Sequence, residues 1–569
     1  FETEILFKKD FSTAYIINAE DYGVTAGTKE DMREKLREVI SKVRKMGSQE
    51  KVLLLPRGEI YIYDTPEKEN AYALDLKGIR NLTVEGGETN FLLDMTARGI
   101  RVEECENVVL RDISFDRFDL PYFSGTVEKM DLEKQHAILN IYDGYDPESP
   151  YPVREYLEFN EEDKTPRYHG NFLYNNLEVD VLVEMIKGVR VTDNHKAEID
   201  FSWDITEAPK GCGYVITKTM YGVDTIAFIK SKEIYTENVS IYCTPGMGIR
   251  GYSSENIHMN RTNIMLKPGS DRYMTVTADA MHFMDCKGEL VMTNCLMENS
   301  HDDAVNIHGM FQMIVDVDRD HERYRMLCAR TAKFDEPKKD DEMTIPFEVG
   351  DEIEVSEDDT LKLIRTVHVA SVEMDEEYGF WVTFEEKTEF AIGLLMCNVT
   401  RNPKVLIDNC IFRNKRNRGV LLQSRNSQIK NCTFYNVLMP AICLVADCQN
   451  WHEGINGKDI QIRNNRFINT NLIRNNFKKL GNGDIDIAVY SKYGAIESGL
   501  IEDVHICDNA FINSGGNCIS AKSLKQSEIS GNFFYCCGSE IEKEKRKPVV
   551  EGYTEDVHIH SNDIVARQD

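Results

Sequence analysis

Three aspartates near the middle of the chain have types and spacing that suit acid–base chemistry. Asp302 and Asp303 are adjacent in NSHDDAVNIHG (299–309), and Asp279 lies 23 residues before Asp302 in TADAMHF (277–283). Crowded carboxyl groups repel one another, which raises one pKa and leaves a general acid beside a general base. Neighbouring side chains on a strand point to opposite faces, so both aspartates can face one cleft only if the backbone turns or bulges. The alternative is a polar turn with solvated acids.

Two histidines flank these aspartates in sequence. His282 and His308 could each bind a substrate hydroxyl, or each could be a buried histidine whose hydrogen bonds are satisfied within the fold, and His301 is a weaker candidate. A metal site made of Asp279, His282 and Asp302 matches no established ligand spacing. We therefore predict no metal and no cofactor.

A third group of polar residues lies further along the chain, in NKRNRGVLLQSRN (414–426). Arg416 and Arg418 are two residues apart, which would place them on one face of a strand as a basic lip for a sugar or a carboxylate. Gln423, in the same stretch, is another candidate for substrate binding. The alternative for the arginines is ordinary solvated charge.

The stretch NWHEGING (450–457) adds an aromatic residue and a carboxylate. Trp451 is one of only three tryptophans, and Glu453 follows two residues later. A tryptophan that stacks on a sugar, beside a carboxylate that binds hydroxyls or donates a proton, would suit a glycosidase. The alternative for Glu453 is a plain surface acid. The acidic segment KFDEPKKDDE (333–342) could also supply a carboxylate.

An internal repeat indicates how these residues are positioned. A polar pair, an alternating apolar stretch, and then Asn with Phe or Leu recur in RNLTVEGG (80–87), ENVVLRDISF (106–115), ENVSIYCT (237–244), ENIHMNRTNI (255–264), PKVLIDNCIF (403–412), SQIKNCTF (427–434), KDIQIRNNRF (458–467), EDVHICDNAF (502–511) and EDVHIHSND (555–563). One copy cannot bury its own apolar face, so the copies must stack. Strand-like alternation with Asn at the bends predicts an all-β fold, a right-handed parallel β-helix. Asp279 and Asp302 would then lie one coil apart, at ~4.8 Å.

The repeat also predicts a division of the chain into five parts. Residues 31–47 have helical periodicity and a closing glycine, which predicts a capping helix, and 51–63 would be the first coil. Long alternating strands interrupt the repeat twice. The strands of the second interruption resemble those of a small antiparallel β-barrel. The five expected parts are the cap and first coils, 1–117; an antiparallel insertion, 118–228; the central coils, 229–309; an inserted barrel, 310–398; and the C-terminal coils, 399–569.

Composition narrows the classes of partner. The formal net charge is −29, from 96 acidic and 67 basic residues, which disfavours nucleic acid, anionic membranes and polyanionic substrates. No apolar run approaches the ~18 residues that a membrane-spanning helix needs. The chain begins at Phe1 without a signal-peptide pattern or an initiator methionine, which leaves room for an upstream segment.

The fifteen cysteines follow the repeat and form no CxxC pair. Cys295, Cys410 and Cys432 each follow the Asn of a coil motif, which predicts buried free thiols that act as small apolar residues. Such thiols suit a reducing compartment.

These motifs resemble glycoside hydrolase family 110. The resemblance rests on TADAMHF, on the segment 286–309, on 414–426, on NWHEG (450–454) and on DRFDLPYFSGTV (116–127). The family contains bacterial exo-acting α-1,3-galactosidases, some of which remove terminal galactose from blood-group B or linear α-Gal structures. A weaker version of the aspartate block also occurs in other β-helix glycosidases.

The resemblance implies an inverting hydrolysis that needs no metal and forms no covalent intermediate. Carried onto this chain, the catalytic set would be Asp279, Asp302 and Asp303. We favour Asp302 and Asp303 on the water side and Asp279 as their partner or the acid, while Glu453 remains a candidate for the acid. The arginines would only bind substrate.

The same residues also fit other classes of function. A polygalacturonase-like hydrolase, a lyase and a non-catalytic carbohydrate-binding β-helix are the alternatives. The expected partner is a terminal α-galactosyl glycan, with neither nucleic acid nor membrane, and uncovered sheet edges favour a homodimer. The resemblance implies a periplasmic or secreted protein, whereas the thiols suit the cytoplasm.

Overall fold

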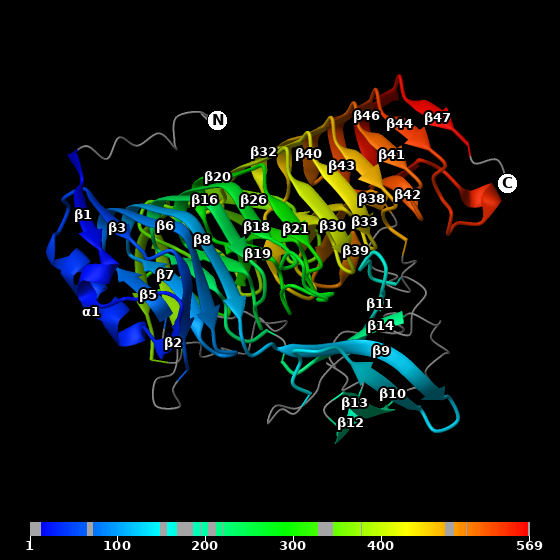
Figure 1. Cartoon of the computed structure of the whole chain (residues 1–569). Coiled ribbons are helices and arrows are strands. Elements are labelled where there is room, and N and C mark those ends of the chain that lie inside the picture. The colour runs from blue at the N-terminus through cyan, green and yellow to red at the C-terminus, as the bar shows by residue number, and fades with distance from the viewer. Residues whose placement is uncertain are drawn as a thin grey trace.

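The computed structural model describes residues 13–64, 72–147, 156–167, 186–193, 195–202, 212–219, 221–327, 345–376, 378–472, 483–496 and 498–566. Strands of successive coils stack in parallel along the molecule, from the N-terminal to the C-terminal end (Figure 1). The predicted parallel β-helix is therefore confirmed.

Three rows of parallel strands form the coils. The first row contains β1 (Tyr15–Asn18), β3 (Lys51–Leu54), β6 (Arg80–Leu93), β8 (Glu106–Arg117), β16 (Lys232–Ile241), β18 (Glu255–Ile264), β20 (Lys287–Thr293), β29 (Lys404–Asp408), β32 (Arg425–Lys430), β36 (Lys458–Arg463), β40 (Ile501–Cys507), β43 (Leu524–Ser530) and β46 (Thr554–His560). The second row shares the four long strands β6, β8, β16 and β18 and adds β2 (Thr28–Asp31), β4 (Gly58–Ile62), β21 (Leu296–Glu298), β30 (Ile411–Lys415), β33 (Thr433–Val437), β37 (Arg466–Ile468), β41 (Ala510–Ile512), β44 (Phe533–Tyr535) and β47 (Asp563–Val565).

The third row lies in the other large sheet and carries part of the candidate site. Its strands are β5 (Tyr72–Lys77), β7 (Arg98–Glu103), β15 (Ile226–Ile229), β17 (Ile249–Tyr252), β19 (Met281–Met284), β22 (Val305–Met313), β31 (Val420–Leu422), β34 (Ile442–Asp447), β38 (Gly483–Ser491), β42 (Asn517–Ala521) and β45 (Val549–Glu551). The short strands β35 (Glu453–Gly454) and β39 (Gly494–Ile496) pair with it in antiparallel fashion.

Identical side chains stack inside the coils. Phe412, Phe434, Phe467, Phe511 and Phe534 form a buried column with ring centroids 4.6 to 5.1 Å apart. Such stacked aromatic pairs stabilise the fold beyond what the burial of their apolar area provides. The core of the helix therefore consists of contacts between equivalent residues of successive coils.

Asparagine amides form a second column. The Nδ2 groups of Asn465, Asn509 and Asn532 each donate to Oδ1 of the next asparagine at 3.0 Å, and the column ends at Asn562. Asn107 donates to Asn81 in the same way at 2.7 Å, and both adopt a positive φ. The predicted role of asparagine in the bends and ladders is confirmed.

The predicted thiols and capping helix are also found. Fourteen cysteines are free among the described residues, and all but Cys507, Cys536 and Cys537 are buried. Helix α1 (Arg33–Lys45) buries Leu36, Val39, Ile40 and Val43 against the first coils. The expectation that 51–63 forms the first coil is wrong, because β1 and β2 precede α1 and already stack on β3 and β4.

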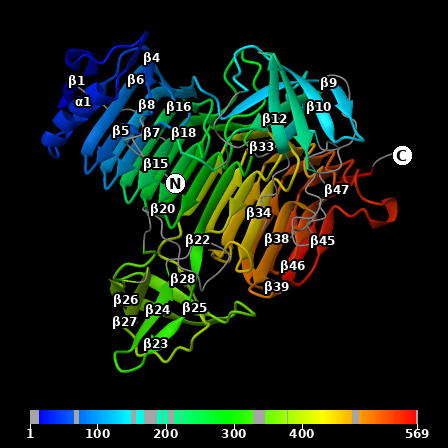
Figure 2. The same ribbon diagram turned by 90° about the horizontal axis from the view of Figure 1, so that it is seen from below.

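Two antiparallel units interrupt the coils, on opposite sides of the helix (Figure 2). The first follows β8 and consists of β9 (Tyr122–Asp131), β10 (His136–Ile141), β11 (Tyr156–Asn160), β12 (Ile186–Asp193), β13 (Lys196–Phe201) and β14 (Cys212–Thr217). The second, here called the β23–β28 lobe, consists of β23 (Asp316–Asp318), β24 (Arg323–Leu327), β25 (Glu352–Ser356), β26 (Leu363–Met374), β27 (Gly379–Phe384) and β28 (Leu395–Asn398). This lobe has its own apolar core and extends directly from β22.

Within the described ranges, the structure contains no helix that combines the length and apolarity needed to span a membrane.

The buried asparagine column predicts a cost for its interruption. Asn509→Ala leaves the amide of Asn465 without its side-chain acceptor and removes the donor to the carbonyl of Ile462. Each buried polar group left without a partner costs ~1–3 kcal/mol, so the free energy of unfolding should fall by at least that amount. Thermal and denaturant unfolding measure the loss. The control Gln461→Ala, on an outward-facing position of β36, should change stability by less than ~0.5 kcal/mol. Equal stability of the two variants would contradict the expectation.

Candidate active site

A bend at residues 301–304, between β21 and β22, carries the two adjacent aspartates. The backbone N–H of Asp303 donates to Oδ1 of Asp302 at 3.0 Å and to Oδ1 of Asp279 at 3.1 Å. One oxygen of each carboxyl group lies within 4.8 Å of the others. The chain thus turns at the predicted place, and the three aspartates converge on one spot.

The register differs from the prediction by one residue. Strands β19 and β22 pair Met281 with Val305, an offset of 24 residues, so Asp279 lies opposite Asp303. The expectation that Asp279 stacks beside Asp302 is therefore wrong in register. Asp302 joins the cluster because the bend turns its side chain toward Asp279.

Asp303 is the most deeply buried of the three and forms a two-point ion pair. Its Oδ1 and Oδ2 accept from Nε and Nη2 of Arg418 at 2.8 and 2.7 Å. Burial raises the pKa of Asp303 to about 7, against the pull of the Arg418 charge, and the neighbouring charge of Asp302 acts in the same direction as burial. The ion pair fixes the carboxylate, and with it the bend.

Asp302 is the most exposed of the three aspartates. Tyr221 donates its hydroxyl to Oδ2, and Asn417 donates its amide to Oδ1. Burial opposes ionisation, but the hydrogen bond from Tyr221 and the charge of Arg418 outweigh it, and the pKa of Asp302 lies below its ordinary value. Asp302 is therefore ionised at neutral pH.

Asp279 belongs to a chain of hydrogen bonds with the two histidines. Its Oδ2 lies 2.7 Å from Nδ1 of His282, Nε2 of His282 lies 2.9 Å from Nε2 of His308, and Nδ1 of His308 lies 2.9 Å from the carbonyl oxygen of Gly309. Burial lowers the pKa of both histidines, so both are neutral at pH 7.

This chain determines where its protons lie. Nδ1 of His308 faces a carbonyl and must donate, so Nε2 of His308 accepts from His282. Nδ1 of His282 then has only a lone pair to offer, and the proton between it and Asp279 belongs to the carboxyl group. Burial and the charge of Asp302 raise the pKa of Asp279 well above its ordinary value, which agrees with this assignment.

Glu453 lies on the other side of the histidine pair. Its Oε1 is 3.6 Å from Nε2 of His308 and accepts from Nδ2 of Asn306 at 3.3 Å, and its Oε2 accepts from Nε2 of Gln423 at 3.2 Å. The side chain is largely buried, so the surface-acid interpretation is wrong. Glu453, Gln423 and Asn306 form a polar group that can exchange hydrogen bonds with sugar hydroxyls.

The arginines do not lie on a strand, contrary to the prediction. Arg416 and Arg418 are in the bend that follows β30, and Arg418 forms the two-point ion pair with Asp303. Arg416 is buried and donates to the carbonyl oxygen of His301 at 3.1 Å, so it supports the bend at 301–304 from below. The two arginines therefore connect the bend after β30 to the bend at 301–304, in place of the predicted basic lip.

The remaining candidates are placed as follows. Trp451 is 55% exposed and lies two residues before Glu453, where a flat ring could meet a ligand. His301 is buried against Arg416. The acidic segment 333–342 lies outside the described residues.

Four polar partners were not among the candidates identified from the sequence. Lys415 donates to Ser300 and to the carbonyl oxygen of Asp302, Asn417 and Tyr221 bind Asp302, and Asn306 binds Glu453. Lys415 and Asn417 alternate with the two arginines that were considered, and the constant offset of 115 residues between the two bends would have paired Asn417 with Asp302. Tyr221 has no such signal, since it follows an insertion.

The aspartate cluster could also offer oxygen ligands to a metal ion. Arg418 already occupies both oxygens of Asp303, and the ammonium of Lys415 lies under the bend, where burial lowers its pKa to about 8. These cations supply positive charge where a metal would. The donor set therefore suits proton transfer better than metal binding.

Removal of the Arg418 charge should destabilise the protein in a pH-dependent manner. Arg418→Met leaves Asp303 buried without its partner, which costs ~3–5 kcal/mol where that carboxyl is ionised. The folded-state pKa of Asp303 is raised, so the folded protein takes up its proton first as pH falls, and the loss should be larger at pH 8 than at pH 5. Thermal unfolding at both pH values measures this. The control Arg425→Met removes a partly exposed pair with Glu354 and should cost ~1 kcal/mol or less. A loss independent of pH would contradict the ionised pair.

Several bacterial proteins that share one name are similar to this chain in sequence. The chain is 25% identical over 501 residues to a protein named Alpha-1,3-galactosidase B from Phocaeicola vulgatus, with 80% of each chain covered. It is 26% identical over 499 residues to Alpha-1,3-galactosidase A from Akkermansia muciniphila, which covers 85% of this chain and 78% of that protein. It is 25% identical over 537 residues to Alpha-1,3-galactosidase A from Bacteroides fragilis, which covers 88% and 84%.

Two solved structures align with nearly the whole chain, at low sequence identity. The A-module of the mannuronan C-5 epimerase AlgE6 from Azotobacter vinelandii aligns with a TM-score of 0.44 at 10% identity, over 97% of this chain and 100% of that chain. An exopolygalacturonase from Thermotoga maritima aligns with a TM-score of 0.43 at 12% identity, over 96% and 91%. Similarity at this level carries no argument about function, and no protein-family model matches the chain. The sequence relatives, by contrast, align with most of this chain, and their names agree with the resemblance to glycoside hydrolase family 110.

Proposed function

We propose that the protein is an exo-acting glycoside hydrolase that releases terminal α-1,3-linked galactose from glycans of the blood-group B or linear α-Gal type. The reaction class is supported above all by the different surroundings of two neighbouring carboxyl groups. Asp302 accepts a hydrogen bond from Tyr221 and has a lowered pKa, whereas Asp279 is buried against His282 and has a raised pKa. Glycoside hydrolysis needs such a pair. The sugar is proposed from the names of the relatives.

The charge states assign roles to the carboxylates. Asp302, held by Tyr221 and Asn417, is the base that takes a proton from the attacking water. Asp279 is the acid, and it gives the leaving oxygen the proton that it otherwise shares with His282. Asp303 does not transfer a proton; its ion pair with Arg418 holds the bend and keeps a negative charge beside the positive charge that develops on the sugar ring.

Substrate recognition would fall to the group around Glu453. A carboxylate and two amides, Gln423 and Asn306, offer both acceptors and donors to sugar hydroxyls. Trp451, exposed beside them in sequence, would stack on an apolar sugar face. These roles are compatible with a galactose at the end of a chain.

We further propose that the anomeric configuration is inverted, as the family resemblance implies. Inverting pairs usually stand ~6.5–9.5 Å apart and retaining pairs ~5–5.5 Å apart. The aspartate oxygens lie within 4.8 Å of one another, which is closer to the retaining value. The configuration of the product therefore decides between the two mechanisms.

The substrate and the product are tested together. The protein is incubated with Gal-α-1,3-Gal, the branched B trisaccharide and polygalacturonate, with and without EDTA, and the first product is followed by proton NMR. Release of β-galactose that EDTA does not affect is expected, and the Asp302→Asn variant should lose at least ~10³-fold in kcat/KM. Release of α-galactose would identify retention with Asp302 as nucleophile. Cleavage of polygalacturonate alone, or unchanged galactose release by Asp302→Asn, would refute the proposal.

The roles of Asp279 and Asp302 are separated by leaving-group dependence. A general acid is dispensable when the leaving group needs no protonation, so Asp279→Asn should keep much more of its activity on an activated aryl α-galactoside than on the disaccharide. Asp302→Asn should lose activity on both substrates, because the water remains unactivated. Measured kcat/KM values for both variants check this. The reverse pattern would make Asp302 the acid.

A further inference from the structure

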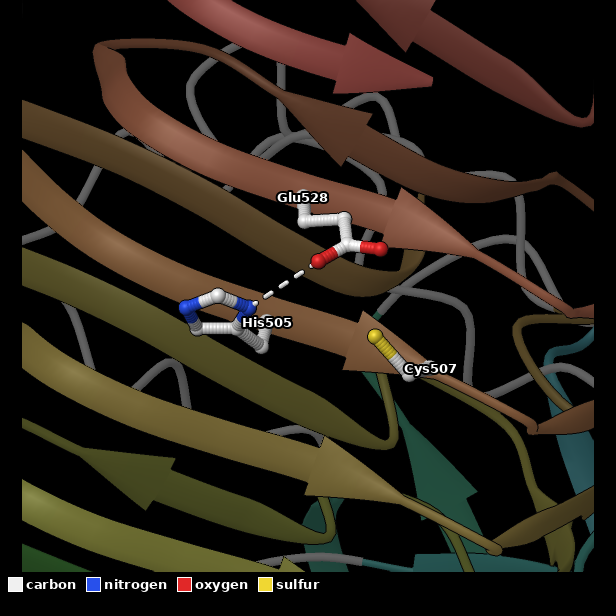
Figure 3. A group of neighbouring side chains, drawn as sticks. All are labelled: His505, Cys507 and Glu528. Atoms are coloured by element: carbon white, nitrogen blue, oxygen red, sulfur yellow. Dashed lines mark ion pairs between the residues drawn. The ribbon is translucent and has the colours of Figure 1, made fainter. Parts of the chain in front are cut away.

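A second group of potential ligands lies far from the aspartates, on the last coils of the first row. His505 and Cys507 project from β40 and Glu528 projects from the neighbouring strand β43 (Figure 3). One donor atom of each lies within 4.8 Å of the others, and Nδ1 of His505 is 3.4 Å from Oε2 of Glu528. Donor atoms bound to one tetrahedral zinc ion at ~2.0–2.3 Å lie about 3.3–3.8 Å apart. Small side-chain rotations would complete such a site.

Two of the three ligands, His505 and Glu528, are each oriented by a further hydrogen bond. Nε2 of His505 faces Oδ1 of Asp503 at 3.0 Å, which leaves Nδ1 free to turn toward a cation. The hydroxyl of Ser530 donates to Oε1 of Glu528 at 2.6 Å. A carboxylate behind a histidine is the usual outer-shell partner in metal sites, where it fixes the tautomer and raises ligand basicity.

Cys507 differs from the cysteines of the core. The thiols of Cys295, Cys410 and Cys432 are buried, whereas Cys507 is partly exposed on the outer face. The coils before it carry Arg463 and Lys430 at the same place in the row. A cysteine at this hydrophilic position fills no core, and a thiol beside an imidazole and a carboxylate is a ligand set that soft or borderline cations prefer.

A fourth ligand is available on the next coil. Strand β46 places His560 beside Ser530, and Nε2 of His560 lies 3.4 Å from Oε1 of Glu528. His560 belongs to the His-x-His pattern at 558–560. His560 faces Oε1 of Glu528, whereas His505 faces Oε2 of the same carboxylate.

We propose that His505, Cys507 and Glu528 bind a Zn²⁺ ion, with His560 as the fourth ligand. The ion links three successive coils near the C-terminal end of the described helix, where β46 is largely exposed. It has a structural role, separate from hydrolysis.

The proposal is tested with the full chain after removal of bound metal. Calorimetric titration with Zn²⁺ should show one saturable event that the Asp302→Asn variant retains, and the melting temperature should rise with Zn²⁺ concentration. Co²⁺ in place of Zn²⁺ should give a thiolate-to-metal charge-transfer band. Cys507→Ser and Glu528→Gln should each weaken Zn²⁺ binding at least tenfold, and Asp503→Asn should weaken it about 10- to 100-fold.

A matched control and the folded state of the variants keep the test decisive. Cys536→Ser removes another partly exposed cysteine of the last coils and should leave both the Zn²⁺ affinity and the Co²⁺ band unchanged. Without metal, the Cys507→Ser, Glu528→Gln, Asp503→Asn and Cys536→Ser variants should each melt at the temperature of the parent protein. Absence of a saturable event in the parent protein would overturn the proposal. So would undiminished binding by a Cys507→Ser/Glu528→Gln double variant.

Discussion

The in-register stacking of parallel strands determines where every functional side chain of this protein lies. Each coil pairs its backbone with the coil before and after it, so a residue has fixed neighbours that are one coil away rather than adjacent in sequence. The stacked phenylalanines and buried asparagines are one result of that constraint. The aspartate cluster is another, because Asp279 meets Asp303 only through the 24-residue register of β19 and β22.

Charge at the aspartate cluster is balanced by unequal surroundings. Three carboxyl groups of the same kind differ because Arg418 engages one, Tyr221 and Asn417 bind another, and a neutral histidine pair accepts from the third. Burial alone would raise the pKa of all three. The hydrogen bond from Tyr221 and the charge of Arg418 lower the pKa of Asp302. The difference between an acid and a base here therefore depends on residues of other coils and on Tyr221, which follows the first insertion.

The sequence predicts the fold better than it predicts the details of the site. Alternation, asparagine at the bends and stackable copies are local features, and they are sufficient for a parallel β-helix with a capping helix. The turn at Asp302 and Asp303 follows from stereochemistry in the same way. What the sequence leaves undetermined is register: one residue of offset exchanges the partner of Asp279, and the period-two argument fails for Arg416 and Arg418 because they lie in a bend. Contacts such as Tyr221 to Asp302 are not predictable because they join an insertion to a coil.

Strand β22 belongs to two structures at once. Its first half pairs with β19 and β31 in the helix, and its end pairs with β28 in the β23–β28 lobe. His308 is the last residue that pairs with β19, directly before the residues that pair with β35. A lobe attached through an irregular linker could tilt without effect on the coil below it. Here the attachment is an unbroken strand. Displacement of the lobe must therefore either shift His308 relative to His282 and Glu453 or break backbone pairs of β22. Movement of the lobe is therefore coupled to the hydrogen-bond chain of Asp279, His282 and His308.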